Sequence, residues 1–325
     1  MRLNATALAL IAGLLLAGPV FAQGTGRSLD IQPGARENGM GAAGVALAES
    51  PSGMTWWNPA GLGFLKKPAG DVTGAQLVPG LATDVYHMHL AGVFPIEGLG
   101  GVGISNVYLS YGESEGVDVT GHSTGMFTSY EVSPAVSFGV QVIPNVAFGA
   151  TAKWIRIQLA PQSMQGVGST VGFDLGGLAK IPIELAKGKF SVNAGAMLQN
   201  LGPSVTFINE DQASPLSRNL KLGIAAMGEV GGMFHTGLVA DFNQSLVTNS
   251  FRTYNGGVEL GVKPSGEITA MLRLGYYYDK LGDIRNLTFG MGGNFGPGMF
   301  DFAAIPQARD SGLEYVKKFT LGFRF

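Results

Sequence analysis

The sequence contains no cysteine in 325 residues. Disulfide bonds are therefore excluded, and so is a lipid anchor attached to cysteine. An exported chain of this kind must be stabilised in another way. A closed β-barrel achieves this through the hydrogen bonds between its strands.

Charge is also scarce, because Asp, Glu, Lys and Arg make up only 14% of the residues, about half the usual share. The net charge of −2 excludes the basic footprint of a nucleic-acid-binding protein. Mean hydropathy is +0.22, yet no unbroken apolar run after residue 22 is long enough for a transmembrane helix. High hydropathy without such runs is typical of alternating strands. Glycine is abundant, but it follows no three-residue repeat, which excludes collagen.

Residues 1–22 have the pattern of a secretory signal peptide. Arg2 is the only charged residue, Leu8 to Leu16 form a short apolar core, and Pro19 interrupts it. Val20-Phe21-Ala22 offers small residues for cleavage before Gln23. We expect export and a mature chain of about 300 residues.

The C-terminal segment alternates with period two. Phe319, Leu321, Phe323 and Phe325 point to one side of an extended strand, and Lys318, Thr320, Gly322 and Arg324 point to the other. This pattern suits the last strand of an outer-membrane barrel, although a soluble sandwich would show the same alternation. We interpret Phe323 and Phe325 as a C-terminal signal for barrel assembly.

Similar alternation recurs from Asp71 onward and predicts about fourteen strands. Pro134 is expected near a rim, because proline would interrupt a central ladder. The connections alternate between short turns (143–145, 229–232, 263–266 and 296–298) and longer loops (113–123, 160–166, 202–218 and 279–286). If Phe325 lies at the periplasmic rim, every short turn lies on the periplasmic side. The fold class is therefore all-β, a transmembrane antiparallel barrel.

Residues 23–69 differ from the strands that follow. Residues 34–49 are rich in glycine and alanine and are expected to form a loose helix, and Asn58 and Pro59 suit a helix start. We expect a short helical plug within the barrel lumen, with a surface arm as the alternative. Its motif is Trp57, Asn58, Pro59, Ala60, Gly61 and Leu62. The predicted organisation is a signal peptide (1–22), a plug (23–69) and a barrel (70–325).

The chain resembles the PorV/PorQ family of FadL-like outer-membrane barrels. The resemblance is carried by residues 34–48 (GARENGMGAAGVALA) and 57–62 (WNPAGL), and by FDLG (173–176), QNLGP (199–203), LKLG (220–223) and LRLGY (272–276). It implies a fourteen-stranded barrel with an N-terminal plug. PorV-like members serve type IX protein secretion by receiving cargo at the outer membrane, whereas FadL-like members move hydrophobic small molecules through a lateral opening. Membership therefore determines architecture better than activity.

Motifs for other chemistry are weak. Gly98 to Gly103 matches a dinucleotide fingerprint, but a strand-like segment follows it instead of a helix. His87 and His89 share a strand face, but two ligands are too few for a metal site, and we expect polar lumen histidines instead. We predict no enzyme activity, no catalytic residue, no metal and no cofactor.

Six charged residues fall on the predicted lumen face and are candidate lumen-lining groups: Lys153, Asp174, Asp241, Glu259, Arg273 and Asp301. They would form a polar pathway or a surface that contacts cargo. The simpler interpretation is that they pair with each other and with Arg36 and Glu37 of the plug.

We therefore expect an outer-membrane protein of a Gram-negative bacterium. By the resemblance, it is a component in export or surface attachment of secreted proteins. A FadL-type channel for hydrophobic small molecules and a structural envelope barrel are the alternatives. Expected partners are outer-membrane lipid, secreted cargo and secretion or attachment machinery, with hydrophobic small molecules under the channel alternative. No nucleic acid is expected.

Overall fold

The computed structural model describes residues 24–325, apart from 119, 186–187, 248–250, 265, 283 and 309–311. The predicted signal peptide, residues 1–22, lies outside the described residues.

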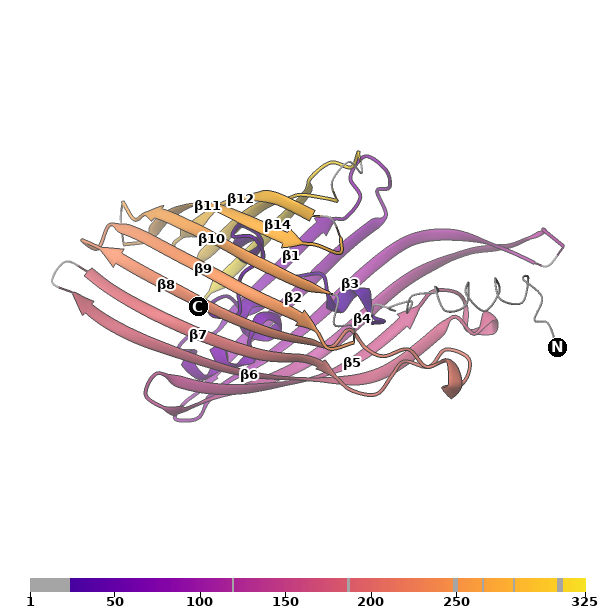
Figure 1. Ribbon diagram of the computed structural model, residues 1–325, viewed down its shortest axis with the longest axis horizontal. Coiled ribbons are helices and arrows are strands. Elements are labelled where there is room, and N and C mark those ends of the chain that lie inside the picture. Colours follow the sequence, from indigo (N-terminus) through magenta and orange to yellow (C-terminus); the bar gives the residue numbers. More distant parts are fainter. Residues whose placement is uncertain are drawn as a thin grey trace, which may run out of the picture.

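The chain forms a closed antiparallel barrel in which each strand pairs with its neighbours in sequence, and β1 pairs with β14 to complete the ring (Figure 1). This confirms the predicted barrel of about fourteen strands. The strands are β1 (Ala69–Gln76), β2 (Val85–Ile96), β3 (Gly100–Val117), β4 (Ser123–Ile143), β5 (Val146–Gln158), β6 (Val167–Leu185), β7 (Gly188–Leu201), β8 (Asn219–Val230), β9 (Phe234–Ser245), β10 (Arg252–Val262), β11 (Ile268–Asp279), β12 (Ile284–Phe295), β13 (Gly298–Ile305) and β14 (Val316–Arg324).

Side chains alternate between the two faces of the wall, as the sequence predicted. In β14, Phe319, Leu321 and Phe323 are exposed on the outside, whereas Lys318 and Thr320 are buried inside. In β11, Leu272 is 69% exposed and its neighbour Arg273 is 6% exposed. Because apolar side chains cover the outside and polar ones face inward, lipid tails are the natural solvent of this surface. No helix within the described ranges has the length and apolar character of a membrane-spanning helix.

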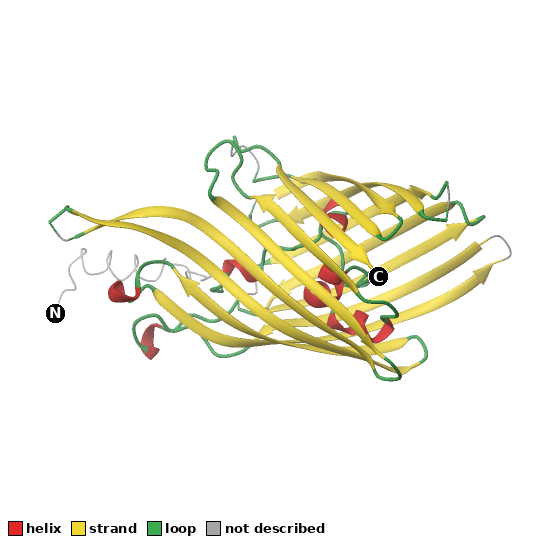
Figure 2. Cartoon of the chain, turned by 180° about the vertical axis from the view of Figure 1, so that it is seen from behind, coloured by secondary structure: helices red, strands yellow, loops and turns green. Residues whose placement is uncertain are grey.

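The N-terminal segment, residues 24–68, lies inside the barrel, where most of its residues are buried (Figure 2). It contains short helical turns, η1 (Arg27–Leu29), α2 (Ala35–Gly39), η2 (Gly53–Trp57) and η3 (Pro59–Phe64). The loose helix expected over residues 34–49 is wrong beyond Gly39, because Gly41 and Ala42 have φ values of 78° and 60° and end it.

Glycines on the inner wall allow the segment to approach the strands closely. A Cβ atom added to Gly275 would lie 2.0 Å from the backbone nitrogen of Gly41. One added to Gly149 would lie 2.3 Å from the carbonyl carbon of Pro59. These contacts explain why the polar face of the wall is rich in glycine: larger side chains would displace the segment.

The two ends of the barrel differ in the length of their connections. The predicted short turns lie between β4 and β5, β8 and β9, β10 and β11, and β12 and β13, and we call this the short-turn end. The opposite, long-loop end differs from expectation at residues 113–123. These residues mostly continue β3 and β4 as a hairpin, with only a tight turn after Asp118, and the hairpin projects well past the rest of the barrel (Figures 1 and 2).

The prediction that Pro134 lies near a rim is wrong. It lies inside β4, nine residues before the strand ends at Ile143. Pro134 keeps its register with Asn106 of β3, but the ladder between β4 and β5 skips Ser133 and Pro134. Since proline has no N–H to donate, the wall is interrupted on that side only.

Candidate functional site

An ion-pair network joins the inner wall to the N-terminal segment, and Glu259 of β10 lies at its centre. The Glu259 carboxylate accepts hydrogen bonds from Arg36 of the segment at 2.9 and 3.1 Å and from Arg273 Nε at 2.6 Å. It also contacts His235 Nε2 at 3.0 Å. The side chain of Glu259 is completely buried, so the cations around it replace the lost water.

The network extends in two directions from this centre. Arg273 Nη1 donates to Asp301 at 2.6 Å, which ties β11 to β13. Arg36 Nη1 donates to Glu49 at 3.1 Å, and Glu49 in turn pairs with Lys180 at 3.4 Å. The segment is thereby held to opposite parts of the wall.

Burial and pairing act against each other on the charged groups of the segment. Burial opposes the Arg36 cation, but the carboxylates of Glu259 and Glu49 outweigh it and hold the pKa of Arg36 well above its usual value. Burial likewise opposes the Glu49 carboxylate, yet Lys180 and Arg36 outweigh it and lower the pKa of Glu49 to about 2. Both groups are therefore ionised, and the pairs are real ion pairs.

A second network lies nearer the long-loop end. Lys153 pairs with Asp174 at 2.7 Å and donates to Asn200 Oδ1 at 2.9 Å. The Asn200 side chain donates to the carbonyl of Ser217, and the Ser217 hydroxyl donates to Asp30 of the segment. This chain of contacts connects β5 and β6 to the start of the segment.

Three wall carboxylates accept hydrogen bonds from backbone N–H groups of the segment. Asp241 accepts from Gly44 at 2.7 Å and from Val45 at 3.0 Å, Asp71 accepts from Ser52 at 2.9 Å, and Glu131 accepts from Ser28 at 2.8 Å. Sequence reasoning identified Asp241 but missed Asp71 and Glu131. Their signal was available, because both are charged residues on buried, inward-facing strand positions.

The predicted plug motif packs at the centre of the segment. Asn58 caps η3 by accepting from the Ala60 N–H at 3.1 Å, as predicted, and donates to the carbonyls of Val45 and Gly177 at 3.0 Å. Trp57 Nε1 donates to the Pro33 carbonyl at 2.9 Å. The Lys221 ammonium lies 4.0 Å from the ring centroid of Trp56, within cation–π range. Pro59, Ala60, Gly61 and Leu62 are buried against this cluster.

The six candidate lumen-lining residues are all buried inside the barrel, and each takes part in one of these contacts. Arg36 joins them, as expected. Glu37 does not: its carboxylate bonds to Ser50 inside the segment, and burial raises the pKa of Glu37. The assembly role of Phe323 and Phe325 stays a prediction; both side chains are exposed, and their ring centroids lie 5.0 Å apart.

His87 and His89 are fully buried, and none of the described residues forms a hydrogen bond with any of their four ring nitrogens. No group of three or more metal-ligating side chains occurs in the part of the chain that the structure describes.

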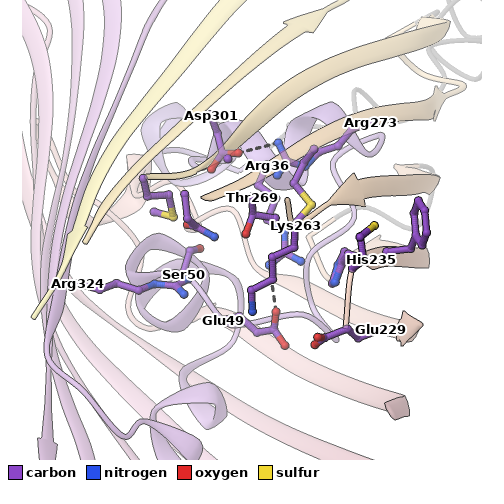
Figure 3. Close-up of a pocket in the computed structure, with 16 residues that line it drawn as sticks. Arg36, Glu49, Ser50, Glu229, His235, Lys263, Thr269, Arg273, Asp301 and Arg324 are labelled. Atoms are coloured by element: carbon purple, nitrogen blue, oxygen red, sulfur yellow. Dashed lines mark hydrogen bonds and ion pairs between the residues drawn. The ribbon is translucent and has the colours of Figure 1, made fainter. Parts of the chain in front are cut away.

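A cavity of about 230 Å³ opens between the segment and the wall at the short-turn end (Figure 3). Arg36, Glu49 and Ser50 approach it from the segment, and Arg273 and Asp301 face it from the wall (Figure 3). Lys263 and Arg324 line its mouth and form no ion pair with any described residue. Most charged side chains in the cavity form ion pairs, and these pairs hold the segment against the wall.

No curated protein matches this chain. Solved structures share its fold. The toluene transporter TbuX of Ralstonia pickettii is 14% identical in sequence with a TM-score of 0.53, and the match covers 90% of this chain and 98% of the TbuX chain. The Pseudomonas putida toluene transporter TodX is 12% identical with a TM-score of 0.50 and the same coverage. A Pseudomonas aeruginosa FadL homologue is 11% identical with a TM-score of 0.48, and the match covers 90% of this chain and 98% of the homologue's chain. The family model "Type IX secretion system protein PorV" matches residues 24–250, more than half of the chain. Because the family model covers more than half of the chain, the chain belongs to the PorV family.

Proposed function

We propose that this barrel is a PorV-like component of protein export, which receives secreted proteins at the outer membrane and passes them to the machinery that attaches them to the surface. In this role it is not an enzyme. The family match over residues 24–250 is the observation that carries the proposal.

The filled lumen supports this role over that of a simple pore. The N-terminal segment is fixed by ion pairs to β10 and β6 and by backbone hydrogen bonds to Asp241 and Asp71. A lumen held closed in this way suits a protein that works through its surfaces, because no free water path is needed to bind a cargo protein.

The test is a cargo-secretion assay on a strain that lacks the gene. The expected result is cargo trapped in the periplasm, with secretion restored when the intact gene is supplied on a plasmid. Normal secretion in the deletion strain would contradict the proposal. A host without a giant type IX translocon barrel and without proteins that carry type IX sorting domains would contradict it as well.

A second candidate is a FadL-type channel for hydrophobic small molecules, and the interruption at Pro134 favours it. Next to Pro134, Asn106 faces the lipid side, and its buried Oδ1 atom has no hydrogen-bond partner among the described residues. The unpaired atom of Asn106 on the β3 side of Pro134 and the skipped ladder on its β5 side mark a weak point in the wall around β4.

Replacing Pro134 with valine tests this candidate, because valine restores the missing N–H donor and favours a strand. If the weak point conducts solutes, uptake of long-chain apolar compounds falls while secretion stays intact. The matched control is Val136→Ile, on the same outer face one step along β4, which leaves both unchanged. If neither secretion nor uptake depends on the protein, a purely structural role in the envelope is favoured instead.

A further inference from the structure

The hairpin that extends β3 and β4 beyond the barrel, residues 112–128, pairs with no third strand among the described residues. We call it the hairpin arm. At its base the Glu113 N–H donates to Asp84 Oδ2 at 3.1 Å, so its β3 edge is open from Ser114 onward. β2 pairs with β3 only as far as Tyr111, and β5 pairs with β4 only as far as Tyr130. Within the described residues, the strand edge from Ser114 to Val117 pairs with β4 alone. Its outer backbone N–H and C=O groups are open to another strand.

The arm carries charge of one sign. Glu113, Glu115 and Asp118 lie on it, and residues 112–128 include no lysine or arginine. Glu113, Glu115 and Val117 alternate along β3 and therefore share one face, and all three are exposed. Val117 and Met126 are 59% and 63% exposed, so the arm also presents apolar surface.

A second copy of the chain is a poor occupant of this edge. Pairing two β3 edges would place acidic side chains opposite acidic side chains, which destabilises cross-strand pairs. A strand with basic residues at every second position fits instead. Its cations repeat at the same spacing, two residues per step, as Glu113 and Glu115 do.

We propose that the free β3 edge of the hairpin arm binds an extended, basic segment of an exported cargo protein by adding it as a third strand. This deepens the proposed export function and rests on it. Main-chain hydrogen bonds along Ser114–Val117 supply affinity, and the two glutamates select a basic sequence.

The test uses the full-length protein in detergent micelles and labelled synthetic peptides of about eight residues, a common strand length. One peptide alternates lysine with threonine. The other has the same charge but proline in place of threonine, and it cannot form the ladder. We expect the alternating peptide to bind about tenfold more tightly than the proline peptide, by fluorescence anisotropy.

Charge-reversal variants locate the site. Glu113→Lys with Glu115→Lys weakens binding of the alternating peptide about tenfold. Glu210→Lys with Asp211→Lys, a matched reversal in the exposed loop before β8, leaves it unchanged within about twofold. Deuterium exchange of the amides at Ser114–Val117 slows when the peptide is bound.

Equal binding of the two peptides, or protection elsewhere than on the arm, would overturn the proposal. So would peptide-driven or spontaneous pairing of two arms, seen as a dimer by light scattering. In cells, normal secretion by the Glu113→Lys, Glu115→Lys strain removes the arm from export but leaves the export function standing. Normal secretion by the complete deletion strain removes the export function itself.

Discussion

At the scale of single residues, Glu259 is a fully buried carboxylate whose charge depends on its ion-pair partners. It forms ion pairs with Arg36 and Arg273 and also contacts His235 Nε2. Glu259→Gln leaves the two buried arginines without their shared counter-charge, so we expect the free energy of unfolding to fall by about 3 kcal/mol. Urea titration of the protein in detergent micelles measures this change in the free energy of unfolding. Glu229→Gln, at a neighbouring position with no ion pair among the described residues, changes it by less than about 0.5 kcal/mol.

The stability of the packed segment depends on pH through Glu49. Its pKa is about 2 in the folded protein, below the value of about 4.3 for a free glutamate. The stabilisation from Glu49 is therefore complete above about pH 4.3 and is lost as the pH falls toward 2.

Fluorescence of Trp56 and Trp57 reports whether the segment stays packed during an acid titration. Because the pairs with Arg36 and Lys180 disappear when Glu49 is protonated, the wild-type signal should change more steeply over this window than that of Glu49→Gln. Identical titration curves for the two proteins would show that these ion pairs contribute nothing to packing.

The sequence predicted many of the charged residues that face the lumen, but not the residues with which they form ion pairs and hydrogen bonds. Lys153, Asp174 and Arg273 were found because alternation places them on the inner face. Their partners were not predictable. Asp30 and Glu49 come from the segment, where no strand periodicity operates, and Asn200 lies near the end of β7, where its φ of 61° breaks the alternation. The hairpin arm was missed for a related reason: Gly112, Gly116 and Gly125 suggest a loop in sequence, yet each is accommodated within the ladder or at its bulges.

At the scale of elements, two neighbouring glycines of β6 provide a matched pair. A Cβ atom on Gly176 would lie 2.2 Å from Asn58 Oδ1, whereas one on Gly177 would lie 3.4 Å from the Phe148 ring, an ordinary contact. Gly176→Ala should therefore displace the plug motif and reduce the free energy of unfolding by about 1–3 kcal/mol. Gly177→Ala should stay within about 0.5 kcal/mol of the wild type by the same urea titration. Equal effects would show that the contact at Asn58 does not limit packing.

The segment as a whole should determine whether ions pass. Removing residues 23–69 empties the centre of the lumen, so ion conductance in planar bilayers should rise well above that of the intact protein. Gly177→Ala serves as a control with an unaltered lumen. Conductance that is unchanged by the deletion would mean that the segment does not occlude the barrel.

At the scale of the whole molecule, the closed ladder and the apolar outer face predict how the protein behaves in solution. With Leu260, Leu272 and Leu321 more than half exposed on the outside, the protein should stay monodisperse only in detergent. Because the ladder closes on itself, the folded form should migrate differently on a gel before and after boiling. Identical migration, with recovery from the soluble periplasmic fraction, would contradict the barrel in a membrane.

The position of the N-terminal segment relative to the closing pair of strands, β1 and β14, restricts the order in which the barrel can assemble. The segment begins near Leu216 at the long-loop end, runs through the barrel, and continues directly into β1 at the short-turn end, where β1 meets β14. Threading Trp56 and Trp57 through a finished ring would break every contact that surrounds them. The wall must instead close around the segment, and the pairing of β1 with β14 is the contact that completes the ring and encloses it.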